Sequence, residues 1–145
     1  MNSMAGEPLL RRNVTGLVLV DEGDSVNNFG GGSSTVSIAA LAIAEASGVP
    51  TLELRGTALE SVLRSEDVVT CIAQLKRRVL IVCGGLLEGA VTQISLSALV
   101  DGFDVFVAAD LIWTAEPGRE PLFFDRITHC CGHVLTYRQI VLELL

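Results

Sequence analysis

Positive charge is scarce in this sequence. Lys and Arg together number 10, against 17 Asp and Glu, and the formal net charge is −7. A protein that binds nucleic acid needs a basic stripe to neutralise phosphates, and this composition does not supply one. We therefore expect no nucleic-acid partner.

Long apolar runs and a signal-peptide pattern are also absent. A membrane helix needs roughly 18 apolar residues in a row, and no run here approaches that length, so we expect no membrane insertion. No secretory signal precedes the four Cys, and Cys83 falls in a predicted buried strand. We expect reduced thiols in an intracellular, cytoplasmic protein. Two Arg in the first 13 residues make a mitochondrial location the alternative.

Residues 79–110 have the pattern of a strand, a turn, a helix and a second strand. Residues 79–82 are a continuous apolar run, glycines follow, and apolar residues then recur with helical spacing until Gly102. Residues 105–109 form another apolar run. Such runs, joined by a helix, belong to a parallel sheet covered on both faces, which binds ligands at the carboxyl ends of its strands.

The rest of the chain continues this alternation of strands and helices. We expect further strands at residues 14–20, 51–54 and 134–137, and further helices at residues 35–47, 57–64, 67–77, 122–131 and 138–144. A chain of 145 residues with 50% hydrophobic content suits one domain with a sizeable core. We predict an α/β fold, a three-layer, doubly wound parallel sheet with helices on both faces. It spans residues 14–145, after a tail of residues 1–13.

Three carboxylates, Asp21, Glu22 and Asp24, follow the first predicted strand. The carboxyl end of a strand is where α/β proteins usually keep their chemistry. The alternative is that these acids cap a loop and remain solvated. The glycine-rich loop of residues 29–34 fits neither a P-loop nor a dinucleotide fingerprint, so we expect no cofactor.

The segment HCCGH resembles a metal-binding cluster in its composition. Its candidate ligands are His129, Cys130, Cys131 and His133. Four ligands within five consecutive residues cannot easily close a tetrahedron, and zinc sites usually space their ligand pairs apart. The surrounding pattern favours a helix that ends at Gly132 and a strand that follows it. We expect no metal site.

The order of these elements resembles that of the isochorismatase-like, or cysteine hydrolase, superfamily. The shared pattern is a glycine turn, a helix with a small-residue end and a strand that ends in Asp, and it is carried by Gly84, Val91, Ala98, Gly102 and Asp110. In that superfamily a nucleophilic Cys begins the helix, and an Asp at the end of the first strand acts as general base. The resemblance assigns Ala90 to the place of the nucleophile and Asp21 to that of the base.

The resemblance also implies that catalytic groups have been lost. A methyl group at Ala90 cannot attack a carbonyl. The middle segment that carries the superfamily's Lys, and in some members a zinc site of one Asp and two His, is shortened here. The only Lys, Lys76, is predicted at a helix end, where it interacts with the helix terminus and solvent. Without its nucleophile, a catalytic triad supplies little rate.

Two functions follow from these observations. The first is a catalytically degenerate protein that acts as a structural or regulatory subunit of a larger assembly, with protein partners or as a homo-oligomer. Its candidate interface residues are the aromatics expected near the rim: Phe29, Trp113, Phe123 and Phe124. The alternative is a hydrolase of a small amide or ester that uses Asp21, Asp24 or Cys83. Cys83 is a weak nucleophile because it lies before the helix terminus that would lower a thiol pKa.

Overall fold

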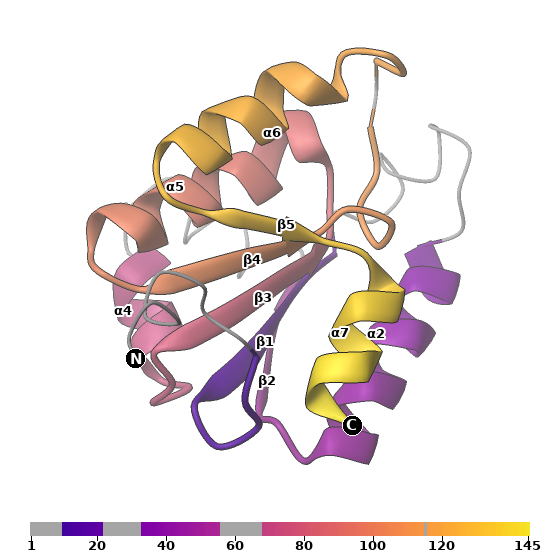
Figure 1. The fold of residues 1–145 in the computed structure, drawn as a ribbon, viewed down its shortest axis with the longest axis vertical. Helices are drawn as coiled ribbons and strands as arrows, with labels where there is room; N and C mark the ends of the chain where they lie inside the picture. The colour runs from indigo at the N-terminus through magenta and orange to yellow at the C-terminus, as the bar shows by residue number, and fades with distance from the viewer. Residues whose placement is uncertain (1–9, 22–32, 56–67, 115) are drawn as a thin grey trace.

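The structure is a computed structural model that describes residues 10–21, 33–55, 68–114 and 116–145. These residues form one 5-stranded parallel sheet between two layers of helices (Figure 1). The strands are β1 (Thr15–Asp21), β2 (Thr51–Arg55), β3 (Val79–Gly84), β4 (Asp104–Ala108) and β5 (His133–Leu135). The helices are α2 (Ser33–Ser47), α4 (Val68–Ala73), α5 (Thr92–Val100), α6 (Glu120–His129) and α7 (Tyr137–Leu144), with a π-helical turn, η2 (Leu87–Val91), before α5. The predicted fold class is confirmed.

The strand order in the sheet is β2-β1-β3-β4-β5. The chain therefore runs outward from β1 to β2 and then crosses back over β1 to continue through β3. Val20 of β1 lies beside Gly84 of β3, and Asp21 lies beside Arg55 of β2. In open parallel sheets, the crevice beyond the strand ends at such a reversal is the usual ligand site. The candidate site is therefore at the carboxyl ends of β1 and β3.

Each face of the sheet packs against its own set of helices. Residues of α4, α5 and α6 form one buried cluster with Leu80 and Val82 of β3. Residues of α2 and α7 form the other cluster with Ile81 and Cys83. Alternate side chains of a strand point to opposite faces, and here both faces are buried. This arrangement explains why β3 is apolar at every position from Val79 to Cys83.

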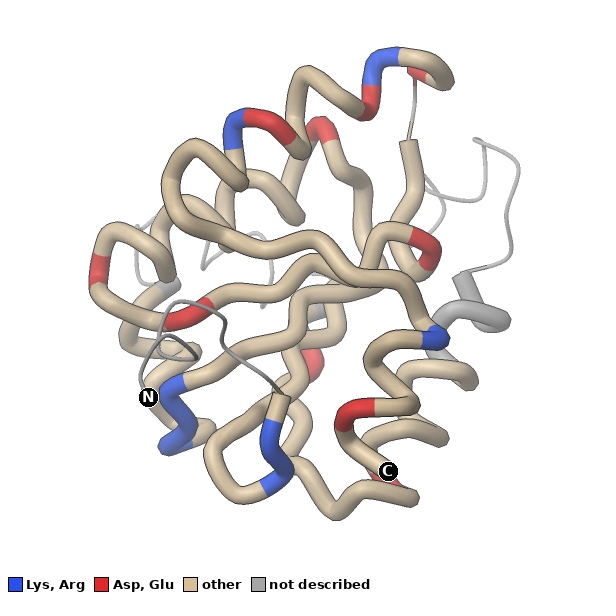
Figure 2. The backbone as a smooth tube through the Cα atoms, viewed as in Figure 1, with Lys and Arg blue, Asp and Glu red and all other residues tan. Residues whose placement is uncertain are grey.

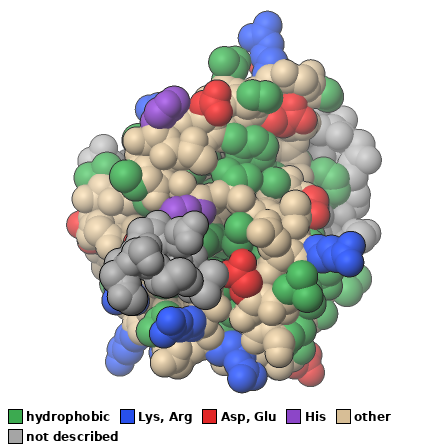
Figure 3. Space-filling model, viewed as in Figure 1, with side chains coloured by type: hydrophobic (Ala, Val, Ile, Leu, Met, Phe, Trp, Pro, Cys, Tyr) green, Lys and Arg blue, Asp and Glu red, His purple; other side chains and the backbone are tan. Residues whose placement is uncertain are grey.

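β5 is an edge strand, and each of its three residues is half-buried. The face seen in Figure 3 has hydrophobic side chains near its middle, with charged groups mainly around them.

The predicted strand at residues 134–137 is too long, because Thr136 instead caps α7. Its hydroxyl accepts a hydrogen bond from the Gln139 N–H at 3.3 Å, so Tyr137 is already helical.

The end of α6 differs from the prediction that Gly132 is its cap. Cys131, not Gly132, has the left-handed backbone, with φ 73. The N–H groups of Cys131 and Gly132 donate to the carbonyls of Thr128 and Ile127, which is the Schellman arrangement. Gly132 is required for another reason: a Cβ there would lie 2.5 Å from Ile127 Cγ2.

Five of the ten basic residues lie where the chain enters β1 and β3, at the sheet edge opposite the candidate site (Figure 2). They are Arg11, Arg12, Lys76, Arg77 and Arg78. The helix predicted at residues 67–77 is shorter than expected, since α4 ends at Ala73 and Lys76 has a left-handed φ of 55. Lys76 is thus in the turn that leads into β3, away from the candidate site.

Other sequence predictions are tested only in part. The predicted helix at residues 57–64, Glu22, Asp24, Phe29 and the glycines of residues 30–32 lie outside the described residues. The predicted tail, residues 1–13, is described from Leu10, which is 2% exposed and donates its N–H to Glu143 Oε1 of α7 at 3.0 Å. Within the described ranges, no helix combines the length and the hydropathy needed to cross a membrane.

Candidate functional site

The end of β3 approaches β1 too closely for any side chain. A Cβ on Gly84 would lie 2.1 Å from the carbonyl oxygen of Val20, and one on Gly85 would lie 2.9 Å from Val20 Cγ1. Both glycines also have left-handed backbones, with φ 79 and 56. The two glycines therefore allow the chain to turn sharply at the strand end, directly beside the residue that precedes Asp21.

The turn continues into η2, where Ala90 lies. The Val91 N–H donates to the Leu86 carbonyl at 3.2 Å, five residues back, which is the hydrogen bond that defines a π-turn. Gly89 has a non-helical backbone, φ −126 and ψ −112. The Thr92 hydroxyl donates to the Leu87 carbonyl at 2.6 Å. Ala90 is held in this turn two residues before α5 begins at Thr92, and it is only 2% exposed.

A short segment after β4 holds the turn in place. The Gly84 N–H donates to the Leu111 carbonyl, the Trp113 N–H donates to the Gly85 carbonyl at 2.8 Å, and the Leu87 N–H donates to the Trp113 carbonyl at 2.7 Å. These bonds extend the β3–β4 pairing beyond the strand ends. The backbone of the turn is therefore fixed on both sides of Leu86.

Glu88 adds a side-chain clamp between the same two segments. Its Oε2 accepts a hydrogen bond from the Thr114 hydroxyl at 2.6 Å and another from the Glu116 N–H at 2.9 Å. Hydrogen bonds to a carboxylate are stronger than those between neutral groups. Glu88 is not among the residues predicted from the sequence, although a lone carboxylate in an otherwise apolar and glycine-rich stretch is a visible signal.

Cys83 lies at the end of β3 but faces away from Ala90. Its side chain belongs to the cluster under α2 and α7, whereas Ala90 belongs to the cluster under α4, α5 and α6. Cys83 is fully buried, and its Sγ lies 3.7 Å from the Val18 carbonyl. Burial raises the pKa of the Cys83 thiol to about 12. A protonated thiol on the other face of the sheet cannot act in place of a group at Ala90.

The comparison with known families gives the same fold assignment. Residues 41–139 match the isochorismatase domain family. The chain belongs to this family. No curated protein sequence matches it significantly.

Solved structures with this fold are similar over almost the whole chain. The YcaC gene product of Escherichia coli, an octameric hydrolase of unknown specificity, has a TM-score of 0.80 at 20% identity, covering 94% of this chain and 81% of that one. YcaC from Pseudomonas aeruginosa, solved with hexane-2,5-diol and covalent acrylamide, gives 0.80 at 20%, covering 95% and 83%. The MAR1 ribonuclease of Caenorhabditis elegans gives 0.73 at 15%, covering 94% and 84%. At these identities the similarity establishes the fold.

Two further residues that the sequence resemblance singled out lie at the same edge of the sheet. Asp21 is the last residue of β1, and its backbone follows Val20 beside the glycine turn. Asp110 follows β4, and its Oδ1 accepts a hydrogen bond from the Tyr137 N–H at 2.7 Å. A carboxylate at a helix amino terminus is stabilising, so Asp110 joins the end of β4 to the start of α7.

The residues of the HCCGH segment are dispersed around the end of α6. His129, Cys130 and Cys131 are exposed, and the His133 ring stacks on Phe106 with centroids 4.8 Å apart. Over the described residues, no three His, Cys, Asp or Glu side chains gather closely enough to hold a metal ion. We assign no metal chemistry to these residues.

Three of the four aromatic residues named as interface candidates are described, and all three are half-buried. Phe123 and Phe124 lie in α6 and pack against its core cluster, and Trp113 packs against the cluster under α2 and α7. The Trp113 Nε1 is buried and has no hydrogen-bond partner. Aliphatic residues dominate the exposed large hydrophobics among the described residues: Ile38, Val100, Leu122, Tyr137, Leu142 and Leu145.

Proposed function

We propose that this isochorismatase-family protein does not carry out the family's nucleophilic chemistry and acts as a structural or regulatory subunit of a protein assembly. The observation that carries the proposal is the buried methyl group of Ala90, in the π-turn where the resemblance expects a thiol. Nucleophilic catalysis needs an activated thiol, hydroxyl or amine at that point. Cys83, the nearest thiol in the sequence, faces the other side of the sheet.

The proposed subunit role has a second support in the related structures. One of them is an octamer, and it shares the fold over 94% of this chain. The described surface also exposes several large aliphatic side chains, for example Val100 at 88% and Leu142 at 72%. Because Val100 and Leu142 lie on helices that cover opposite faces of the sheet, they form no single apolar patch, and the octameric relative is the stronger support. We therefore propose a homo-oligomer as the first form of the assembly.

The proposed lack of hydrolase activity is tested with a panel of small amides and esters. We expect no hydrolysis by the purified protein above the background of buffer. The contradicting result is turnover that falls at least tenfold in both Asp21→Asn and Asp21→Ala, because a general base would then be at work. Cys83→Ala is the matched variant that tests whether any observed turnover depends on Cys83, the alternative nucleophile.

The position of the lost nucleophile is tested by restoring it. Ala90→Cys should introduce a thiol that reacts with acrylamide faster than Cys83 does, since a helix amino terminus lowers a thiol pKa. Peptide mass mapping locates the adduct. Equal rates at Cys83 and at the introduced thiol would contradict the assignment of Ala90 to the nucleophile's place. Circular dichroism of the variant checks that the turn still folds.

A further inference from the structure

The outward side of α5 carries a stripe of residues away from the sheet. Gln93, Leu96, Ser97 and Val100 recur at spacings of three and four residues, so they share one side of the helix. Ile94 and Ala98, on the other side, are fully buried in the core. Val100, the last residue of α5, is 88% exposed.

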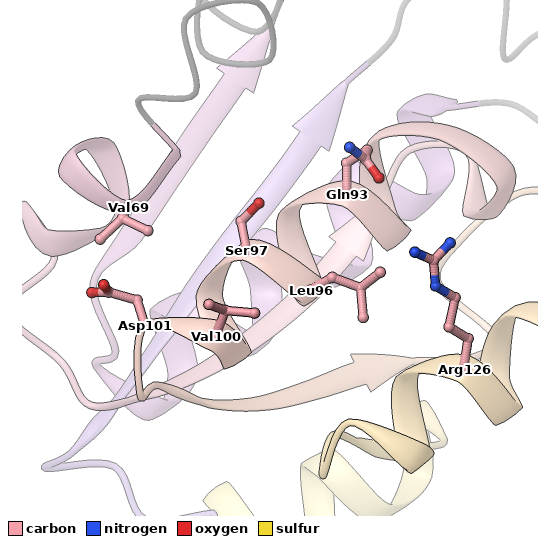
Figure 4. A pocket seen from close by; sticks show the side chains of 7 residues that line it. All are labelled: Val69, Gln93, Leu96, Ser97, Val100, Asp101 and Arg126. Atoms are coloured by element: carbon pink, nitrogen blue, oxygen red, sulfur yellow. The ribbon is translucent and has the colours of Figure 1, made fainter.

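These four residues help to line a shallow, open depression of about 370 Å³. Val69 of α4, Asp101 after α5 and Arg126 of α6 complete its lining. Figure 4 shows Asp101 at one end and Arg126 at the other, with Val100 and Leu96 between them. The depression therefore has an apolar middle and two ends of opposite charge.

Among the described residues, neither charged end of the depression has an ion-pair partner. The ion pairs of the described residues are Arg78 with Asp104 and Arg119 with Glu116, and they involve neither Asp101 nor Arg126. Both charged residues are exposed. A partner that carries an acid opposite Arg126 and a base opposite Asp101 would complement the surface.

A second copy of the same chain meets this requirement. If two copies face each other across a twofold axis over the middle of α5, Arg126 of each copy lies opposite Asp101 of the other. Such an isologous contact uses the same patch twice and is closed. The two α5 helices then run antiparallel, which is also the favourable arrangement of their dipoles. Ser97, a small residue near the axis, allows the helices to approach.

We propose that this protein forms a twofold-symmetric dimer through the α5 depression, with Leu96 and Ser97 near the axis, Val100 between the axis and each end, and two Asp101–Arg126 ion pairs at the ends. The inference rests on the proposed self-association and names its surface. If the protein forms a larger oligomer, this dimer would be its repeating unit.

The apolar centre is tested with Val100→Glu in the full chain, measured by sedimentation velocity and light scattering. We expect the molar mass to fall to half that of the wild type. Ile38→Glu is the matched control, because Ile38 is 69% exposed on α2, on the other face of the sheet. We expect no change in its mass. A Val100→Glu protein with the mass of the wild type would overturn the inference.

The ion pairs are tested with two charge reversals, Asp101→Arg and Arg126→Glu. Each single variant places like charges at both ends of the contact, so each alone should have half the wild-type mass. Mixed in equal amounts, the two variants present opposite charges at both ends and should recover the wild-type mass. Failure of the mixture to recover it would overturn the twofold pairing. Circular dichroism melts show that each variant is folded.

The same measurements separate this inference from the proposal on which it rests. A wild-type chain that remains monomeric over the whole concentration range would overturn both. A wild-type oligomer that is unaffected by Val100→Glu and by both charge reversals would overturn the α5 contact alone, because association would then use another surface.

Discussion

The Thr114 hydroxyl donates a 2.6 Å hydrogen bond to Oε2 of Glu88. The two residues come from segments far apart in the sequence, one in the π-turn after β3 and the other in the loop after β4. Their contact connects the turn that holds Ala90 to its neighbouring loop by a side chain, in addition to the backbone bonds of Trp113. The rigidity of the turn therefore depends on a group that is not part of the superfamily's catalytic set.

Thr114→Val removes this donor and keeps the shape of the side chain. Because hydrogen bonds to charged groups contribute about 1.5–3 kcal/mol when buried and this one is only partly buried, we expect a loss of about 1 kcal/mol in the free energy of unfolding. Urea denaturation measures it. Thr128→Val is the control, since the Thr128 hydroxyl is exposed and bonds only to the carbonyl of Asp125 in its own helix. Equal losses of unfolding free energy in Thr114→Val and Thr128→Val would contradict a stabilising role for the Glu88–Thr114 hydrogen bond.

Cys131→Gly should stabilise the protein. Cys131 has a left-handed φ of 73 at the end of α6, where a side chain is strained and Gly is preferred. After the greater freedom of Gly in the unfolded chain is subtracted, we expect a gain of about 0.5–1 kcal/mol. Thermal and urea denaturation measure the gain.

Cys130→Gly is the matched variant for this prediction. Cys130 is also exposed, but its backbone is right-handed, with φ −93. Gly at that position relieves no strain, so we expect a loss of stability. A stabilised Cys130→Gly, or a destabilised Cys131→Gly, would show that the backbone at this helix end differs from the structure.

Cys83 should be the slowest of the four thiols to react with iodoacetamide in the native protein. It is fully buried and its pKa is about 12, so its thiolate population at neutral pH is very small. Cys130 and Cys131 are exposed and should react first. Peptide mass mapping after timed labelling gives the order, and denaturation should make Cys83 as reactive as the others. Rapid native labelling of Cys83 would revive it as a nucleophile.

The same burial predicts a loss of stability at alkaline pH. The pKa of Cys83 rises from 9.0 to about 12 on folding, so below pH 9 both folded and unfolded states are protonated and nothing is lost. Above pH 9 the unfolded state releases its proton first, and the free energy of unfolding should fall by roughly 1.4 kcal/mol per pH unit until about pH 12. Cys83→Ala should lack this contribution. Parallel stability curves for the two proteins between pH 9 and pH 11 would contradict it.

The sequence predicted the central strands and helices well because their patterns are strong. β3 is apolar along its length, and Gly102, with φ 96, ends α5 as expected. Predictions failed where side chains act locally: the Thr136 cap turned an apparent strand end into a helix start, and Cys131 took the left-handed position expected of Gly132. The pattern of apolar and polar residues does not show which of two local arrangements, such as a side-chain cap or a longer strand, is the more stable.

The sequence was enough to predict at which end of the strands the candidate site lies, but not how its side chains are arranged. Asp21 was predicted from its place at a strand end, and the assignment of Ala90 to the nucleophile's place came from the family resemblance. That Cys83 faces away from Ala90 depends on the alternation along β3 and on which helices cover each face. The clamp by Glu88 depends on how the loop after β4 folds back, which has no sequence signature.

The strand order has a consequence for how the protein is made. β1 pairs with β3 although, among the described residues alone, α2, β2 and α4 lie between them in the sequence. During synthesis β1 therefore emerges from the ribosome long before its central neighbour exists, with one strand edge unpaired. Pairings this distant in sequence form slowly. The pairing of β1 with β3 cannot be completed until Gly84 has been added, so this central part of the sheet forms late in synthesis.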